Sequence, residues 1–285
     1  MSHSIVSIVK GGLGNQLFIY AASRAMSLRL KRELYLDTVL GFQDDSFSRQ
    51  YRLDRFKIIA SEVAEGQRLA PSLKHPKHKL IRAINRFFPR DSRSYFSERW
   101  GVGASQLTAL KPKVDRITLL GYWQDEAYFA DYSDEIRREL ALPLPSNIEI
   151  KQLGDRYRTN ESVFIHFRRI NYNQVLSLDY YQRAIDAICE RVSEPQFVLF
   201  GDSVEEPSRQ LDFRSHKVDL PSFEREDEFS DLWLMSQCRH AIIANSTFSW
   251  WAAWLRDQNN SDLVYAPETM GHELVPAAGW MRLPN

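Results

Sequence analysis

Near its start the chain reads Ile5-Val6-Ser7-Ile8-Val9-Lys10-Gly11-Gly12-Leu13-Gly14-Asn15, which predicts a strand followed by a tight turn. From Asn15 onward, apolar residues recur at the three- and four-residue steps of a helix face: Leu17, Ala21, Ala22, Ala25, Met26 and Leu28. Residues 33–37 then predict a second strand. The order strand, turn, helix, strand is typical of a doubly wound α/β sheet.

The Gly-rich turn resembles part of a dinucleotide-binding fingerprint, with Asp37 as the acid that would bind a ribose. However, Leu17 stands where the third glycine belongs, and Asn15 and Gln16 place two amides at the mouth of the turn. We therefore expect Asn15 and Gln16 to hydrogen-bond a polar ligand. Two alternatives stay open: a nicotinamide or flavin site, and a purely structural turn in which Asn15 caps the helix.

The length of 285 residues suffices for two domains of ordinary size. We place the boundary in the segment Leu142-Pro143-Leu144-Pro145-Ser146-Asn147, which gives domains of residues 1–145 and 146–285. Lys plus Arg and Asp plus Glu both number 37, so the formal net charge is zero. This balance argues against nucleic acid as a partner.

Cysteine usage and hydropathy indicate the compartment. Cys189 and Cys238 fit neither a metal-ligand spacing nor a disulfide framework, which favours a reducing environment. The N-terminus is too short and too polar for a signal peptide, and no run of about 18 apolar residues predicts a membrane span. We expect a soluble, cytoplasmic protein.

The segment from Lys74 to Arg93 is strongly basic, with apolar residues at helical spacing. One interpretation is an ordinary amphipathic helix with a solvated face. The other is a helix that lies on anionic lipid headgroups, which would make the protein peripheral to the inner membrane.

Aromatic and polar residues follow the strand predicted at residues 117–120. Rings that stack on apolar sugar faces, next to amides and carboxylates that meet hydroxyls, suit a carbohydrate at the carboxyl end of a strand. We expect such a site to include Trp123, Gln124, Asp125 and Glu126. The alternative is an aromatic turn packed into the core.

In the second half, His166-Phe167-Arg168-Arg169 comes directly after a predicted strand at residues 163–165. Adjacent arginines need a partner that neutralises them, and a guanidinium binds phosphate with two hydrogen bonds. Because side chains alternate along an extended segment, only Arg168 shares a side with His166. We therefore expect Arg168 at the ligand and Arg169 in a structural role.

Two further strand ends carry polar groups. Asp202 follows the strand predicted at residues 196–200, where a carboxylate can accept from a ribose hydroxyl or a guanine N–H; the alternative is a loop cap. The run Asn245-Ser246-Thr247-Phe248-Ser249-Trp250-Trp251 follows a buried strand at 241–244 and opens a helix. The free N–H groups of a helix N-terminus attract anions. The alternative is a simple helix cap with core tryptophans.

Taken together, these motifs resemble glycosyltransferase family 11, the α-1,2-fucosyltransferases, over nearly the whole chain. They occur in the order Gly11-Gly12-Leu13-Gly14-Asn15-Gln16-Leu17-Phe18, Gly121-Tyr122-Trp123-Gln124, His166-x-Arg168-Arg169 and Asn245-Ser246-Thr247-Phe248-Ser249-Trp250-Trp251-Ala252. The resemblance implies an α/β fold of GT-B architecture, with two Rossmann-like domains facing a cleft. Residues 1–145 would lie on the acceptor side, and residues 146–285 would bind GDP-β-L-fucose.

The resemblance also implies an inverting transfer of L-fucose from GDP-β-L-fucose to the 2-hydroxyl of a terminal galactoside, without metal or cofactor. The acceptor would be a galactose-terminated glycan, including a lipid-linked one. On the donor, Arg168 would contact the pyrophosphate and Asp202 the guanine. The other donor-binding residues would be His166, Asn245, Ser246, Thr247 and Phe248.

For the acceptor, we expect Asn15 to orient the reacting hydroxyl as a catalytic residue. Gln16 would bind the acceptor together with residues 123–126. Candidates for the base that takes the acceptor proton are Asp125, Glu126 and His166.

One departure from the family pattern is Asn171, where the family commonly has Asp. It leaves open a catalytically inactive protein that binds a GDP-sugar or a glycan. A nicotinamide-dependent oxidoreductase would leave Arg168 and the turn at residues 245–249 unexplained. The sequence contains no Asp-x-Asp triplet of the kind that metal-dependent glycosyltransferases use on the diphosphate.

Overall fold

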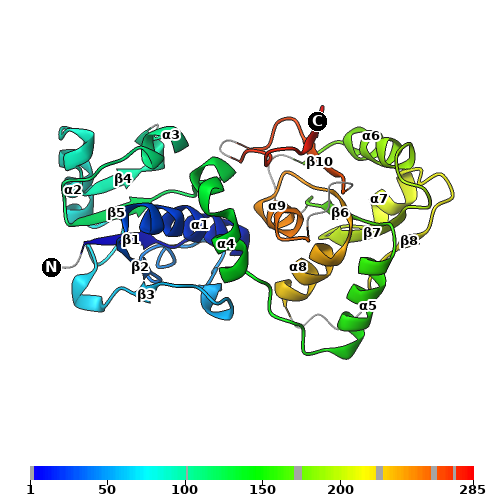
Figure 1. The fold of residues 1–285 in the computed structure, drawn as a ribbon, viewed down its shortest axis with the longest axis horizontal. Coiled ribbons are helices and arrows are strands. Elements are labelled where there is room, and N and C mark those ends of the chain that lie inside the picture. The colour runs from blue at the N-terminus through cyan, green and yellow to red at the C-terminus, as the bar shows by residue number, and fades with distance from the viewer. Residues whose placement is uncertain (1–2, 101, 170–174, 223–226, 258–261, 272–273) are drawn as a thin grey trace. The chain divides into compact units, whose positions relative to one another are not determined.

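The computed structural model describes residues 3–100, 102–169, 175–222, 227–257, 262–271 and 274–285. Asn171 lies outside the described residues. The chain divides into two compact units, Met1–Ala141 and Leu142–Asn285 (Figure 1). Leu142 is the first residue of the Pro-rich segment in which the sequence places a domain boundary.

In its described residues, the first unit holds a five-stranded parallel sheet with the strand order β3-β2-β1-β5-β4. The strands are β1 (Ser4–Ile8), β2 (Glu33–Asp37), β3 (Ser61–Glu62), β4 (Tyr95–Ser97) and β5 (Arg116–Leu120). The helices are α1 (Leu13–Leu30), α2 (Pro76–Asn85), α3 (Ala104–Thr108) and α4 (Ser133–Glu139). Short 3-10 helices occupy Leu53–Arg55, Glu65–Gln67, Arg90–Ser92, Glu98–Trp100, Glu126–Tyr128 and Ala130–Tyr132.

The predicted opening of strand, turn, helix and strand is confirmed by β1, α1 and β2. Helix α1 begins at Leu13, two residues before the expected Asn15. Every residue of β1 is buried, as expected for a central strand of a parallel sheet that is covered on both faces. The order reverses between β1 and β5, so the crevice for a ligand is expected where these two strands end.

A buried ionic cluster joins α1 to α4. Arg24 donates to both oxygens of Glu139, and the Tyr20 hydroxyl donates to the same carboxylate. The Ile59 N–H donates to the Tyr20 oxygen at 2.9 Å. Burial and the Glu139 carboxylate raise the pKa of Tyr20 well above its usual range. Because Glu139 is only 8% exposed, this cluster fixes α4 on α1 immediately before the division between the units.

In its described residues, the second unit holds a six-stranded parallel sheet with the order β11-β10-β9-β6-β7-β8. The strands are β6 (Ser162–Phe167), β7 (Gln196–Gly201), β8 (Val218–Asp219), β9 (His240–Ile242), β10 (Val264–Pro267) and β11 (Met281–Leu283). The helices are α5 (Ile148–Thr159), α6 (Leu178–Cys189), α7 (Glu205–Gln210), α8 (Glu228–Gln237) and α9 (Thr247–Trp254). Numbered from β6, this is the strand order of a dinucleotide-binding Rossmann fold.

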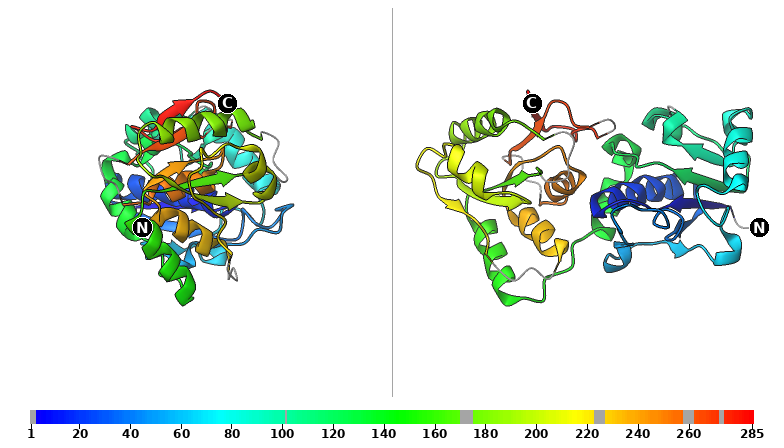
Figure 2. Two further views of the ribbon diagram at one scale, coloured as in Figure 1. Left: turned by 90° about the vertical axis from the view of Figure 1, so that its right-hand side faces the viewer. Right: turned by 180° about the vertical axis from the view of Figure 1, so that it is seen from behind.

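Helices cover both faces of this sheet, as the views in Figure 2 show. Val163 and Ile165 of β6 pack in one cluster with Tyr181 and Ile185 of α6. His166 points to the opposite face, because successive side chains of a strand alternate. The strand order reverses between β6 and β9, so the ends of these strands form the crevice in which Rossmann folds bind ligands.

Candidate functional site

The predicted donor-binding residues of the second unit follow β6, β7 and β9, which are neighbours in the sheet. Gly201 ends β7 with φ of +137°, a conformation that residues with a side chain rarely adopt. A Cβ atom on Gly201 would lie 2.1 Å from the carbonyl oxygen of Phe167 on β6. The glycine therefore allows the ends of β6 and β7 to approach closely just before Asp202.

Asp202 binds the turn after β6 through both carboxylate oxygens. Its Oδ2 lies 2.9 Å from Nη1 of Arg168, and its Oδ1 accepts the N–H of Arg169 at 2.8 Å. The Arg168 side chain is 42% exposed, whereas that of Asp202 is 20% exposed. Nη2 of Arg169 lies 3.4 Å from Glu206, which fits its expected structural role. Asp202 thus positions Arg168 while leaving part of the guanidinium open to a ligand.

His166 is buried on the same turn, with 6% of its surface exposed. Burial, reinforced by the positive charge of Arg168, lowers the pKa of His166 to about 4. The ring is therefore neutral at neutral pH, and its Nδ1 has no hydrogen-bond partner within the described part of the chain. Its centroid lies 5.9 Å from that of the Phe248 ring on α9, so the turns after β6 and β9 meet here.

The turn after β9 is held by three polar side chains. Asn245 is buried and accepts the Gly271 N–H at 2.7 Å. Ser246 caps α9, because its Oγ accepts the Phe248 N–H at 3.3 Å. The buried Ser249 hydroxyl donates back to the carbonyls of residues 244 and 246. Asn245 therefore braces the turn, and the partly exposed residues 246–248 are better placed than Asn245 for the predicted contact with a donor.

Helix α9 combines an anion-binding end with a buried body. The Thr247 N–H has no acceptor among the described residues, and the 3.3 Å contact of the Phe248 N–H is long for a hydrogen bond. Trp250, Trp251 and Trp254 have no exposed surface, which confirms that they pack in the core. The helix therefore presents first-turn N–H groups beside His166, at a place where anions are stabilised.

The first unit has a second polar cluster at the ends of β1 and β5. The Gln124 amide donates to Oδ1 of Asn15 at 2.8 Å. Nζ of Lys10 lies 4.0 Å from the centroid of the Tyr122 ring, in a cation–π contact. Gly11 has φ of +79°, and a Cβ atom there would lie 2.7 Å from the Asn15 amide nitrogen. The structure therefore brings Asn15 and Gln124 together at the switch point of this sheet, which is the place between β1 and β5 where the strand order reverses. Both side chains are partly exposed.

Glu98, which the sequence analysis missed, shapes this cluster. Its carboxylate accepts the backbone N–H groups of Tyr122 at 2.6 Å and Trp123 at 2.8 Å. Trp123 has φ of 55°, so the loop after β5 adopts a left-handed conformation that these two bonds support. The three-residue strand β4 that precedes Glu98 is too short to give a periodic signal, so the sequence offered no reason to select it.

Two predicted acceptor residues do not fit a binding role. Gln16 has no exposed surface; its amide donates to the carbonyls of Gly11 and Gln50, and its oxygen accepts the Arg52 N–H. Trp123 also has no exposed surface and packs edge-on against Tyr128. Both predictions of direct acceptor contact are therefore corrected. The amide of Gln16 is already hydrogen-bonded, and the ring of Trp123 is covered by other residues. Each side chain fixes a loop instead.

Asp125 and Glu126 remain partly exposed beside this loop. Asp125 caps the 3-10 helix Glu126–Tyr128 by accepting the Ala127 N–H at 2.9 Å. Asp37 is 1% exposed and accepts the N–H groups of Val39 and Leu40. It therefore cannot bind a ribose, and the nicotinamide alternative loses the acid on which it depends.

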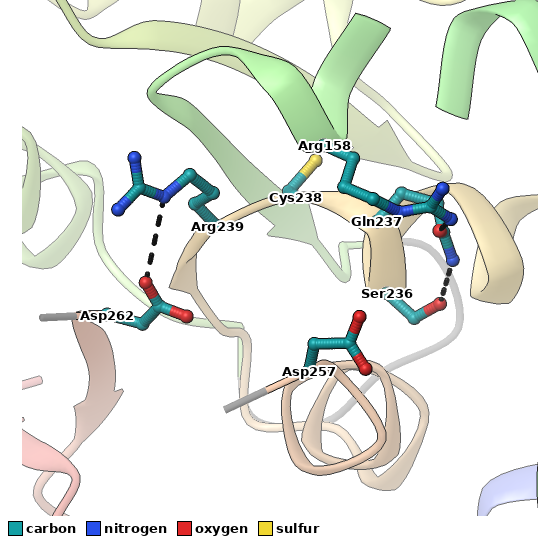
Figure 3. A pocket seen from close by; sticks show the side chains of 7 residues that line it. All are labelled: Arg158, Ser236, Gln237, Cys238, Arg239, Asp257 and Asp262. Carbon is teal, nitrogen blue, oxygen red and sulfur yellow. Dashed lines mark hydrogen bonds and ion pairs between the residues drawn. The ribbon is translucent and has the colours of Figure 1, made fainter. Parts of the chain in front are cut away.

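A separate polar cavity of about 260 Å³ lies at the amino end of β9, shown in Figure 3. It is lined by Arg158, Ser236, Gln237, Cys238, Arg239, Asp257 and Asp262. Arg239 and Asp262, which precede β9 and β10, face each other across 3.8 Å. The cavity is at the sheet edge opposite the switch point, so it is not part of the predicted donor site. No group of three or more metal-ligating side chains occurs among the described residues.

Comparison with known proteins agrees with the motifs. The model of the family described as "Glycosyl transferase family 11" matches residues 4–270. An Escherichia coli alpha-1,2-colitosyltransferase is 31% identical over 267 residues, which cover 89% of this chain and 88% of that protein. Human galactoside alpha-(1,2)-fucosyltransferase 1 is 27% identical over 168 residues, which cover 52% of this chain and 45% of that protein.

Solved structures share the fold. Fucosyltransferase NodZ from Bradyrhizobium superposes with a TM-score of 0.52 at 17% sequence identity, covering 95% of this chain and 97% of NodZ. A variant of Arabidopsis thaliana FUT1 in complex with GDP gives a TM-score of 0.53 at 13% identity, covering 95% of this chain and 72% of FUT1. At these identities the likeness concerns the fold alone.

Proposed function

This chain belongs to glycosyltransferase family 11 and has the GT-B fold, and from that premise we propose that it transfers L-fucose from GDP-β-L-fucose to the 2-hydroxyl of a terminal galactoside. The transfer is inverting and metal-independent, and it serves the synthesis of a glycan or surface polysaccharide. The observation that carries the proposal is the convergence of Arg168, neutral His166 and the N-terminus of α9 at the switch point of the second sheet. A relative named for α-1,2-colitosyl transfer and one named for α-1,2-fucosyl transfer both support the linkage.

On the donor, the protein acts on the leaving group. Cleavage of the bond from the sugar carbon to the phosphate leaves negative charge on the diphosphate and positive charge on the sugar carbon. The exposed part of the Arg168 guanidinium and the N–H groups of Thr247 and Phe248 can stabilise that negative charge. Asp202 holds Arg168 before the donor arrives, so little reorganisation is needed during the reaction. Metal independence is supported by the lack of an Asp-x-Asp triplet in the sequence.

His166 contributes as a neutral group. A pKa of about 4 makes its ring a weak base, so it is poorly suited to remove the acceptor proton. Its unpartnered Nδ1 is instead suited to a hydrogen bond with the donor. Asp125 and Glu126 stay as candidates for the base; a loose transition state also allows water or the leaving phosphate to take the proton.

On the acceptor, Asn15 and Gln124 form the site in the first unit. Their mutual hydrogen bond fixes the two amides at the ends of β1 and β5. Gln124 donates to Asn15, which leaves the Asn15 amide N–H groups and the Gln124 oxygen to meet hydroxyl groups. We assign to Asn15 the orientation of the reacting hydroxyl.

The alternative candidate for the donor is GDP-colitose, because one relative is named as an alpha-1,2-colitosyltransferase. The test supplies GDP-fucose and GDP-colitose separately with a panel of galactose-terminated oligosaccharides and determines the linkage of each product. Faster transfer from GDP-fucose, with a 1,2-linked product, is the expected result. Faster transfer from GDP-colitose would reassign the donor, and GDP binding without transfer from either donor would make the protein an inactive GDP-sugar-binding member of the family.

A further inference from the structure

Helix α2 packs on the first unit through polar side chains. His78 has no exposed surface; its Nε2 lies 3.2 Å from the Tyr95 hydroxyl. Asn85 is also buried, and its Oδ1 accepts the N–H groups of Ser94 at 2.8 Å and Tyr95 at 3.1 Å. The side of α2 that faces β4 is thus held by these hydrogen bonds and by an edge-on contact between the His78 and Tyr95 rings.

The apolar side chains of the same segment point outward. Leu80 is 60% exposed, Ile84 46%, Phe87 89% and Phe88 47%. Leu80, Ile84 and Phe88 are spaced four residues apart, as on one stripe of a helix, although α2 itself ends at Asn85. A helix on a water-soluble protein normally turns this stripe inward. The interpretation of an ordinary amphipathic helix with a solvated polar face does not account for this outward apolar stripe.

Positive charge surrounds these apolar side chains. Lys77, Lys79, Arg86 and Arg90 are exposed, and none of them forms an ion pair with a described residue. Asp91, the only acid between residues 74 and 93, is paired with Lys113 at 2.5 Å. The surface therefore combines exposed aromatic and aliphatic groups with unneutralised cations.

We propose that α2 and residues 86–90 form a docking surface for an anionic lipid bilayer. Exposed Leu, Ile and Phe side chains insert at the boundary of headgroups and acyl chains, while Lys and Arg contact the anionic headgroups. Within the described residues no helix has both the length and the apolar character to cross a membrane. The proposed contact is thus with the bilayer surface.

The charges favour lipid over other occupants. A second copy of the chain, packed through a two-fold axis, would bring this basic surface against the same basic surface of its partner. A nucleic acid would meet the cations and could stack on Phe87, but it would leave the exposed aliphatic side chains of Leu80 and Ile84 without an apolar partner. An anionic bilayer satisfies both features, and it does so independently of the proposed transfer activity.

The test is co-sedimentation of the full chain with vesicles of phosphatidylglycerol and phosphatidylcholine in equal parts. We expect binding to these vesicles, weaker binding at high salt, and little binding to vesicles of phosphatidylcholine alone. Replacement of Phe87→Ser together with Phe88→Ser should reduce the partition coefficient at least about tenfold, because the inserted apolar surface is lost. Leu144→Ser, which changes an exposed apolar residue outside the basic segment, should leave it unchanged.

Charge reversal in α2 provides an independent test of lipid binding. Lys77→Glu together with Lys79→Glu should also reduce the partition coefficient at least about tenfold, since each cation near an anionic surface strengthens binding about fivefold. The matched control, Lys57→Glu with Lys217→Glu, changes the net charge equally but outside the segment, and should bind nearly as the wild type does.

Circular dichroism and GDP binding confirm that each variant is folded. The proposal fails if the wild type does not sediment with the anionic vesicles, or if the Phe87 and Phe88 substitutions leave binding intact in a folded protein. It also fails if the chain forms a dimer in sedimentation velocity that these substitutions dissociate, without vesicle binding. That outcome would assign the surface to a second copy.

Discussion

Nη1 of Arg168 and Oδ2 of Asp202 lie 2.9 Å apart, and the pair joins the turns after two neighbouring strands. The arginine is the more exposed partner, so a ligand can reach it while Asp202 fixes its direction. Since Asp202 also accepts the Arg169 N–H, the carboxylate fixes both the backbone and the side chain of this turn.

Replacement of Arg168→Ala should lower the transfer rate by about 10²–10³ while the protein stays folded. The guanidinium is 42% exposed, so its loss leaves no large cavity but removes a donor from the leaving diphosphate. Initial rates with saturating donor and acceptor measure the effect. Arg168→Lys keeps the charge but loses the planar guanidinium, so its transfer rate should lie between those of the wild type and Arg168→Ala. Rates of Arg168→Ala close to wild type would remove this residue from the mechanism.

Asp202→Asn separates positioning of Arg168 from recognition of guanine. If Asp202 positions Arg168, kcat should fall about tenfold, and the preference for GDP over IDP, which lacks the 2-amino group, should not change. Competitive inhibition by the two nucleotides measures that preference. A clear loss of the preference in Asp202→Asn would instead assign the carboxylate to guanine, as the family resemblance implies, and Asp202→Glu should then restore it partly.

Glu98→Gln should loosen the loop that carries Tyr122 and Trp123. Each of the two backbone N–H bonds would lose a charged acceptor, and such bonds contribute roughly 1.5–3 kcal/mol. We expect the acceptor KM to rise about tenfold, with the inhibition constant of GDP unchanged, because Glu98 lies in the first unit. Glu65→Gln, at an exposed position, serves as the control. An unchanged acceptor KM would show that the loop does not need Glu98.

Transfer should survive excess EDTA, because the proposed stabilisation of the diphosphate uses a guanidinium and N–H groups. Turnover measured after dialysis against EDTA, with and without added Mg²⁺ or Mn²⁺, checks this expectation. Loss of activity that either ion restores would contradict the metal-independent scheme.

Much of the fold could be predicted because parallel strands buried on both faces give continuous apolar runs. This holds for β1, β6, β7 and β9, whose ends carry the predicted polar motifs. Strands β3, β4, β10 and β11 were not predicted; β3, β4 and β11 have only two or three residues, which show no period. The proximity of Arg168 and Asp202 could have been predicted as well, because the carboxyl ends of neighbouring parallel strands meet at one edge of the sheet.

The direction of individual side chains could not be predicted in the same way. Gln16 lies in the first turn of α1, after β1, and Trp123 lies in the loop after β5, but both side chains turn inward. Spacing along the chain locates a loop near the site, whereas tertiary packing decides which of its side chains face solvent. The outward stripe of α2 has the same cause: the sequence shows helical spacing, and only the contacts of His78 and Asn85 reveal which side faces the sheet.

Acid should destabilise the folded protein between about pH 6.5 and pH 4 through His166. Its folded-state pKa is about 4, lowered by burial and by Arg168, whereas an unfolded histidine titrates near about 6.5. Between these values the unfolded chain binds a proton that the folded chain does not, so the free energy of unfolding decreases as the pH falls; above this window His166 contributes nothing to the pH dependence. This pKa difference corresponds to about 3 kcal/mol of folding stability, lost in full only when the pH falls below the folded-state pKa.

Burial also lowers the pKa of His78 and of His240. Urea unfolding of the wild type and of His166→Gln across this range isolates the contribution: the variant should lose less stability on acidification, and parallel profiles would show that His166 is protonated equally in both states.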